Sequence, residues 1–430
     1  MSEKERSWRA VPPPVTGFGV LNMPPMEDRE LASGAKLHVL NQGQLDVCRV
    51  CCLVPGGIAE AENAVLPRLL LSMFQEGTCA HPGVKLAETI EFDGASVQTG
   101  LYPHYMLVGI NMLNSKADKV IPLLKEMLFT PELASIPFET CIDRLAQSVE
   151  LMEKRVEYMA SKALTRLSAG QDHPLARTMS ASQIRGVELD SLYQWHKYAC
   201  AHASGMHIYI GGNVTDGLVS LVEGVFDNYG VPGKSMPFNI VPFAPQVPQR
   251  LHVPVEGALQ CAVRMTAPAI PRSNPDYIGL RLLVMALGGY FGSRLMMNIR
   301  EDKGYTYGIS ASLNGQPEGS FVEIAASTDA VNVEPLIEET LKEIAAMSSG
   351  NFTVDEVERL KSFATSQLAS MLDTPFDMMD YHVTLQAAYI PQPDYFRCQY
   401  NQIRKLTPGL LTELARKYLN PDEFSVVIAG

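Results

Sequence analysis

The chain repeats short pieces of its own sequence about halfway along its 430 residues. The repeated pieces, in chain order, are Gln183-Ile184-Arg185 with Gln402-Ile403-Arg404, Lys197-Tyr198 with Lys417-Tyr418, and Ile210-Gly211 with Ile428-Ala429-Gly430. The first pair lies 219 positions apart and the second pair 220. Three matches in order at nearly one offset indicate an internal duplication of roughly 215 residues, so we expect two similar halves.

The two halves carry the same kinds of secondary structure in a similar order. Apolar patterning predicts strands at 36–40, 47–55, 95–99, 104–110 and 207–211, and again at 251–253, 258–265, 306–312, 320–326 and 424–428. Helices are predicted between them, including one long helix at 138–168. This arrangement predicts an α+β fold with two homologous domains, each a mostly antiparallel sheet covered by helices.

A proline cluster separates the two halves. Its members are Pro232, Pro237, Pro242, Pro245 and Pro248, and the stretch has little periodicity. We therefore predict an N-terminal domain at 1–231, a linker at 232–249 and a C-terminal domain at 250–430.

Charge and hydropathy argue against several kinds of partner. A formal net charge of −12 disfavours binding to nucleic acid or to an anionic membrane. The longest apolar stretch, 282–292, is shorter than the roughly 20 residues that span a bilayer. Residues 1–20 lack the apolar core of a signal peptide, so a cytoplasmic location is expected.

The eight cysteines are scattered along the chain. Cys48 and Cys51 have the spacing of half a zinc knuckle, but no second C-x-x-C accompanies them. Residues 47–54 favour a buried strand, in which successive side chains alternate between faces. We therefore predict structural thiols here and no metal site.

Three motifs resemble those of a known family. They are Met73-Phe74-Gln75-Glu76-Gly77-Thr78, Asp172-His173-Pro174-Leu175-Ala176-Arg177, and a longer run that begins Leu287-Gly288-Gly289-Tyr290 and ends at Tyr307. The family is that of the pitrilysin-type zinc metallopeptidases, which includes mitochondrial processing peptidase. The resemblance extends from about Gly34 to the C-terminus and implies the processing-peptidase-like metallohydrolase fold for both halves.

The zinc motif of that family is missing. In H-x-x-E-H, two histidines one helical turn apart bind zinc and the glutamate acts as general base. Aligned on Gly77, the motif falls on residues 68–72, so Arg68, Leu71 and Ser72 occupy its three functional positions. No two of the nine histidines are four residues apart, so the motif occurs nowhere else in the chain.

Other ligand sets are also incomplete. The family's third ligand, a glutamate, falls near Ser148, and the nearby Glu150 has no companions. The stretch richest in ligand-type residues holds His196, Cys200, His202 and His207. The first two share a helix face, but the two other histidines follow the helix end, and a fourth ligand and a second shell are missing. We therefore predict no catalytic residue, no metal and no cofactor on this chain alone.

The second half keeps the residues that the resemblance assigns to substrate. Arg300 and Tyr307 match an arginine and a tyrosine that, in the family, reach toward the zinc site of the other half and hold the peptide. A guanidinium and a phenol are donors suited to peptide carbonyls and developing oxyanions.

These observations predict a non-catalytic subunit of a pitrilysin-type zinc peptidase. Its partner would be a chain with intact H-x-x-E-H, which brings the zinc, or a second copy of itself, and its substrate an extended peptide. One alternative is a non-enzymatic scaffold or assembly protein of the same fold. Another is an autonomous zinc hydrolase that uses ligands foreign to the family, namely His196, Cys200 and His202.

Overall fold

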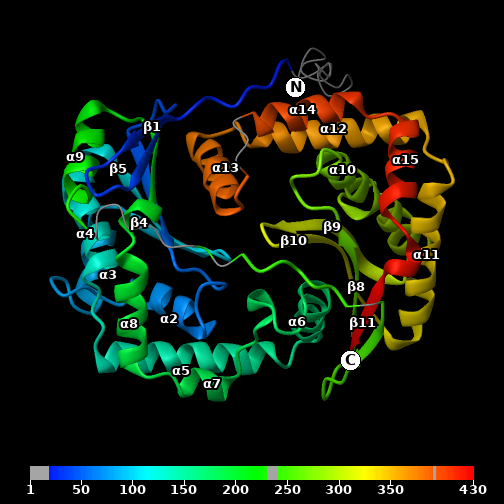
Figure 1. Cartoon of the computed structure of the whole chain (residues 1–430), viewed down its shortest axis with the longest axis horizontal. Coiled ribbons are helices and arrows are strands. Elements are labelled where there is room, and N and C mark those ends of the chain that lie inside the picture. Colours follow the sequence, from blue (N-terminus) through cyan, green and yellow to red (C-terminus); the bar gives the residue numbers. More distant parts are fainter. Residues whose placement is uncertain (1–18, 230–237, 239, 247, 391–393) are drawn as a thin grey trace, which may run out of the picture.

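The computed structural model describes residues 19–229, 238, 240–246, 248–390 and 394–430. It holds two β-sheets, one on each side of the molecule (Figure 1). The first sheet has the order β1-β2-β6-β3-β5-β4. Its strands are β1 (Glu27–Glu30), β2 (Lys36–Asn41), β3 (Val47–Pro55), β4 (Ser96–Leu101), β5 (Tyr105–Leu113) and β6 (His207–Gly212). The accompanying helices are α2 (Val65–Met73), α3 (Val84–Phe92), α4 (Ala117–Phe129), α5 (Ser135–Met152), α6 (Val156–Ala169), α7 (Ala181–Arg185), α8 (Leu189–Cys200) and α9 (Asp216–Phe226).

The second sheet has the order β7-β11-β8-β10-β9. Its strands are β7 (Arg250–Val253), β8 (Cys261–Ala269), β9 (Thr306–Gln316), β10 (Gly319–Thr328) and β11 (Ser425–Ala429). Its helices are α10 (Tyr277–Gly288), the π-helix η4 (Met296–Asp302), α11 (Val333–Ser348), α12 (Val354–Ser370), α13 (Pro375–Ala387), α14 (Tyr395–Lys405) and α15 (Pro408–Tyr418).

The two sheets share one topology apart from the extra strand β1. In each sheet the first strand pairs in parallel with the last one, as β2 does with β6 and β7 with β11. The last strand then runs antiparallel to the second, and a hairpin completes the sheet. The predicted α+β class with two antiparallel-rich, helix-covered sheets is confirmed.

The long helix predicted at 138–168 is wrong, because the chain bends after Met152. Arg155 is extended (φ −96°, ψ 125°) and begins a separate helix, α6. This bend carries α6 away from α5 and onto the second sheet, where Ala160, Leu164 and Leu167 pack against Ala262 and Val427. Apolar periodicity continues through the bend, which is why the sequence pattern does not reveal it.

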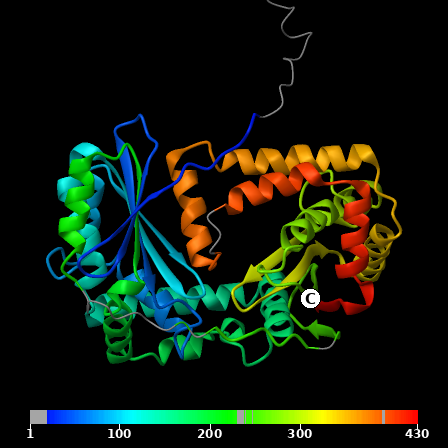
Figure 2. The ribbon, with the colours of Figure 1, turned by 45° about the horizontal axis from the view of Figure 1, so that its top comes forward.

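A helix of the second half packs in return on the first sheet. Met379, Val383 and Ala387 of α13 form a buried cluster with Leu40 of β2 and Tyr209 of β6. Figure 2 shows α13 beside the first sheet, on the side facing the second. Each sheet is thus covered on one face by its own helices and on the other by a helix from the opposite half.

The predicted linker 232–249 lies only partly within the described residues, since residues 230–237, 239 and 247 fall outside them. Its described portion packs against both halves. The amides of Ala244 and Gln246 donate to main-chain carbonyls of α6, at 2.9 and 3.1 Å. The amide of Phe243 donates to the carbonyl of Glu318 at 3.0 Å. In the described part of the chain, no helix combines the length and apolar character needed to cross a membrane.

Candidate functional site

Helix α2 carries the residues that the motif alignment assigns to the zinc positions, and its side chains serve packing. Six of its nine residues are buried, including Leu71, which stands where the general base would be. Arg68 donates to the carbonyl of Ala64 at 3.2 Å, and Ser72 donates to the carbonyl of Arg68 at 3.2 Å. Both polar groups therefore bond within their own helix. A cation and a hydroxyl beside a buried leucine do not fit zinc.

Glu150 also makes a contact unrelated to zinc. Its carboxylate lies 2.7 Å from Arg185, and this hydrogen bond lowers the pKa of Glu150. Both side chains are nearly half exposed, at 46% and 45%. The pair ties α5 to α7 at the surface.

The alternative ligand set does not converge on one point. His196 Nε2 lies 2.7 Å from the carbonyl oxygen of Leu128, and the Cys200 thiol donates to the same oxygen at 3.4 Å. His202 Nδ1 lies 2.7 Å from the carbonyl oxygen of Tyr198, at the helix end. Burial raises the pKa of the Cys200 thiol to about 12, which keeps it protonated. Among the described residues, no three ligand-type side chains gather in a way that could hold a metal ion.

The remaining ligand-type residues of interest are structural. Cys48 and Cys51 lie in β3 and are fully buried on opposite faces, Cys48 in the core of the first half and Cys51 against α13. His207, the fourth member of the ligand-rich stretch, faces His38 of β2 instead, with Nδ1 2.9 Å from Nε2.

Arg300 and Tyr307 meet at one pocket of about 350 Å³. Arg300 belongs to η4 and Tyr307 to the start of β9, and the turn at Gly304 (φ +65°) joins the two elements. A positive φ is easily adopted by glycine, which explains this residue in the turn. The structure therefore brings the two predicted substrate-binding residues to the same surface.

The two side chains are presented differently. The Arg300 guanidinium lies over the ring of Phe291, 5.0 Å from its centroid, and 3.6 Å from the carboxylate of Glu301. These contacts orient the guanidinium but leave the side chain 34% exposed. Tyr307 is 92% exposed. The oriented guanidinium of Arg300 and the exposed phenol of Tyr307 can both donate hydrogen bonds to a ligand.

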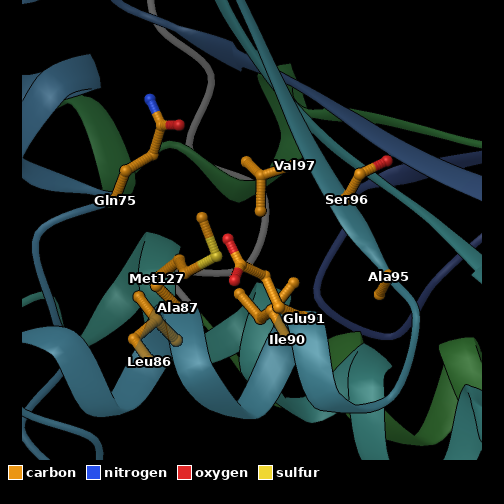
Figure 3. Close-up of a pocket in the computed structure, with 9 residues that line it drawn as sticks. All are labelled: Gln75, Leu86, Ala87, Ile90, Glu91, Ala95, Ser96, Val97 and Met127. Carbon is orange, nitrogen blue, oxygen red and sulfur yellow. The ribbon is translucent and has the colours of Figure 1, made fainter.

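The edge of the first sheet provides a second candidate surface. Strand β4 pairs with β5 and ends the sheet, and no further strand pairs with it among the described residues. A groove of about 320 Å³ runs between β4 and α3. Figure 3 shows Val97 of β4 pointing into this groove, toward Ile90 of α3 and Met127 of α4, while Ser96 points away. An open strand edge suits an extended peptide, and the adjoining groove combines apolar side chains with the polar Gln75 and Glu91.

Comparisons with known proteins agree with this geometry. Residues 186–363 match the profile of a family described as Peptidase M16 inactive domain. "Uncharacterized zinc protease YmxG" of Bacillus subtilis is 21% identical over 312 residues, 72% of this chain and 75% of that protein. "Probable inactive metalloprotease YmfF" of the same organism is 20% identical over 365 residues, 77% and 81% of the two chains.

A solved structure shares the fold. The crystal structure of a peptidase M16 inactive domain from Pseudomonas fluorescens superposes with a TM-score of 0.85 at 21% identity, covering 94% of this chain and 98% of that one. Residues 186–363 therefore resemble an M16 domain and the chain shares the fold of this solved relative, so the resemblance carried by its motifs is confirmed.

Sequence reasoning missed the buried cluster of Glu60, His104 and Glu318, which joins the two halves. These residues lie 44 and 214 positions apart, and each stands in a turn or loop. No spacing rule connects them. The available signal was a histidine in the short β4–β5 connection, flanked by Pro103 and an apolar strand.

Proposed function

We propose that this chain is the non-catalytic subunit of a two-chain M16 peptidase, in which a partner with intact H-x-x-E-H supplies the metal and the general base. This chain contributes Arg300 and Tyr307 to the partner's active site. The observation that carries the proposal is an asymmetry. Helix α2 has lost every zinc-binding side chain, whereas Arg300 and Tyr307 remain together and accessible at one pocket.

Arg300 and Tyr307 act by binding and orienting the peptide. The guanidinium carries a permanent charge and several N–H donors, so it interacts more strongly as negative charge develops on a peptide carbonyl oxygen. The Tyr307 phenol adds a second donor from the neighbouring strand. The stacking of Arg300 on Phe291 supports this role, because it limits the orientations of the guanidinium before peptide binds.

Extended peptides also bind to this chain by adding a strand to the open edge of β4. Backbone hydrogen bonds to a strand edge are independent of sequence, and every second side chain of an added strand lies on the same face of the sheet as Val97. Those side chains would enter the groove between β4 and α3 (Figure 3). The apolar residues of that groove favour apolar substrate side chains.

A cytoplasmic location is part of the proposal. It is supported by the eight cysteines, all of which are present as free thiols. Unpaired thiols are typical of reducing compartments. Cell fractionation followed by immunodetection tests this, and recovery outside the cytoplasm would contradict it.

The test of the subunit role is reconstitution. The purified chain alone is expected to cleave no quenched fluorescent peptide, and a mixture with the H-x-x-E-H partner is expected to be active and sensitive to chelator. Metal analysis of the chain alone, with substoichiometric zinc expected, separates this account from that of an autonomous zinc hydrolase. Zinc-dependent activity from the chain alone would refute the subunit role.

A scaffold or a self-dimer makes different predictions in the same assay. A scaffold binds neither peptide nor the partner's active site, so substituting Arg300 would leave peptidase activity unchanged. If two copies of this chain formed the working assembly, size-exclusion chromatography with light scattering would show a homodimer that binds peptide without cleaving it.

A further inference from the structure

A histidine lies buried between two glutamates where the two halves meet. His104 stands in the β4–β5 connection, Glu60 in the loop after β3, and Glu318 in the turn between β9 and β10. His104 Nδ1 lies 2.5 Å from Glu60, and Nε2 lies 2.7 Å from Glu318. The three side chains are 0%, 4% and 0% exposed. Together they form a Glu–His–Glu cluster.

This cluster needs a positive charge at its centre. A carboxylate removed from water is stable only when charge or hydrogen bonds compensate it. Neither oxygen of Glu318 has a hydrogen bond of good geometry within the described residues. Its compensation is therefore the imidazolium of His104, whose charge lies within ion-pair distance.

The surroundings hold the cluster together and exclude water. Tyr389 follows α13 with a φ of +50°, a backbone conformation that is costly for a residue with a bulky side chain. This conformation accompanies an edge-on contact of its ring with His104, at 5.5 Å. Phe238 makes a similar contact at 5.4 Å.

The loop that carries Glu60 and the turn that carries Glu318 are both anchored by hydrogen bonds to their carbonyl oxygens. Arg177, from the Asp172–Arg177 motif, donates to the carbonyl of Ala61 at 2.5 Å, next to Glu60. The amide of Phe243 donates to the carbonyl of Glu318. His173 of the same motif lies 2.7 Å from the carbonyl oxygen of Val241, so the motif supports the connecting segment as well.

Glu318 stands at one end of the hairpin whose other end carries Tyr307. Strands β9 and β10 are paired in regular register from Gln316–Gly319 at the tip back to Ile309–Ala326, and Thr306 pairs with Thr328 after a register shift. The contact of Glu318 with His104 holds the hairpin tip against the first half. This contact therefore constrains the direction in which the start of β9 presents Tyr307. A paired hairpin transmits such a constraint along its length, because its backbone is held by successive hydrogen bonds.

We propose that Glu60, His104 and Glu318 form an ionic clasp that positions the β9–β10 hairpin, and through it Tyr307, relative to the first half of the chain. All three are positioning residues. The clasp itself follows from the structure of this chain. Its consequence for peptide cleavage rests on the proposed function.

The clasp depends on pH through His104. Glu60, Glu318 and Tyr389 face the imidazole, and Tyr105 stacks on Tyr389 and interacts with Glu60. Burial opposes the charge on His104, but the two carboxylates outweigh it and raise its pKa from 6.5 to about 9. A raised pKa means that the stabilisation is complete below pH 6.5 and is lost as the pH rises through about 9.

Hydrogen exchange of the full chain, followed by mass spectrometry, tests the clasp without any partner. At pH 7, His104→Gln is expected to raise the exchange of the hairpin tip around 316–320 by on the order of a hundredfold, the effect of leaving a buried charge unpaired. His252→Gln and Glu338→Gln, at exposed positions, are the matched controls and are expected to change nothing. Unchanged exchange at the tip in His104→Gln would overturn the clasp.

Two further measurements keep the test decisive if His104→Gln does not fold. The isosteric variant Glu318→Gln is expected to loosen the same tip. In the wild type, exchange corrected for its intrinsic pH dependence is expected to rise at the tip between pH 7 and pH 10 while β3 stays protected. A tip that remains as protected as β3 across that range would also contradict the clasp.

Peptidase assays of the mixed complex separate the clasp from the proposed function. If the clasp positions Tyr307, His104→Gln lowers kcat with little change in KM, and the loss in the wild type follows the same alkaline pH range. A loosened tip with no peptidase activity in any mixture overturns the proposed function and leaves the clasp standing. If His104→Gln loosens the tip but the mixed complex keeps full activity, the clasp does not position Tyr307 for cleavage.

Discussion

Gly288 shows how one residue of the second-half motif serves packing. It ends α10, and a Cβ added there would lie 2.5 Å from the amide nitrogen of Ala311 on β9. Helix and strand approach so closely that only hydrogen fits. Gly288 therefore lets α10 pack closely against β9, the strand that carries Tyr307.

We expect Gly288→Ala to destabilise the protein by about 1–3 kcal/mol, the usual cost of overpacking a core. The matched control is Gly224→Ala in α9, where a Cβ would meet nothing within 4 Å. That variant should be neutral or slightly stabilising, because alanine has the higher helix propensity. Urea unfolding measures both, and equal midpoints for the two variants would contradict the packing role.

We expect His207 to make the stability of the fold depend on pH in the acid range. Burial, followed by the neighbouring His38, lowers the pKa of His207 from 6.5 to about 3. In the unfolded chain this histidine takes up a proton near pH 6.5, whereas in the folded chain it does so only near pH 3. Its contribution to the free energy of unfolding is therefore complete above pH 6.5 and is lost as the pH falls from 6.5 to 3. The expected slope is about 1.4 kcal/mol per pH unit for this group.

Urea unfolding at pH 5 and pH 7 measures the acid dependence. His207→Gln cannot titrate and should lose less stability between these pH values than the wild type does. His252→Gln, at an exposed position on β7, should behave like the wild type. If His207→Gln kept the full acid dependence, another group would be responsible.

At the scale of elements, α6 and α13 connect the halves. Each covers the sheet of the opposite half, so the hydrophobic core of one half is incomplete without a helix from the other. Neither half is expected to fold fully by itself.

Leu164 of α6 tests this dependence, since it is 2% exposed and packs against the second sheet. Leu164→Ala should cost about 2–5 kcal/mol, as large-to-small changes in cores do. It should destabilise both halves in one transition. Leu151→Ala in α5, at a position 65% exposed, is the control. If the variant lost stability in one half only, unfolding would show two separate transitions. That result would contradict the idea that α6 and α13 couple the stabilities of the two halves.

The elements also show what a sequence reveals and what it does not. The paired strands at 95–99 and 104–110 were predictable because glycine and proline break an alternating pattern there. The bend between α5 and α6 was not, because neither glycine nor proline marks residues 153–155. Motif spacing located Arg300 and Tyr307 because they are close in sequence. Contacts between turns, such as that of His104 with Glu318, leave no periodic signal.

The whole molecule combines a duplicated fold with unequal functional surfaces. Both sheets follow one strand order, which agrees with the repeated pieces of sequence. In the proposed role, Arg68, Leu71 and Ser72 stand at the zinc positions of one copy, and Arg300 and Tyr307 are the substrate-binding residues of the other.

The most direct test is the effect of Arg300→Ala on peptide cleavage by the mixed complex of this chain with its H-x-x-E-H partner. Removing a donor that stabilises developing negative charge typically lowers kcat by about 10²–10³-fold, and we expect a loss of that size with the complex still assembled. Arg404→Ala, at an exposed position on α14, should leave kcat unchanged. An assembled, fully active complex containing Arg300→Ala would contradict the account.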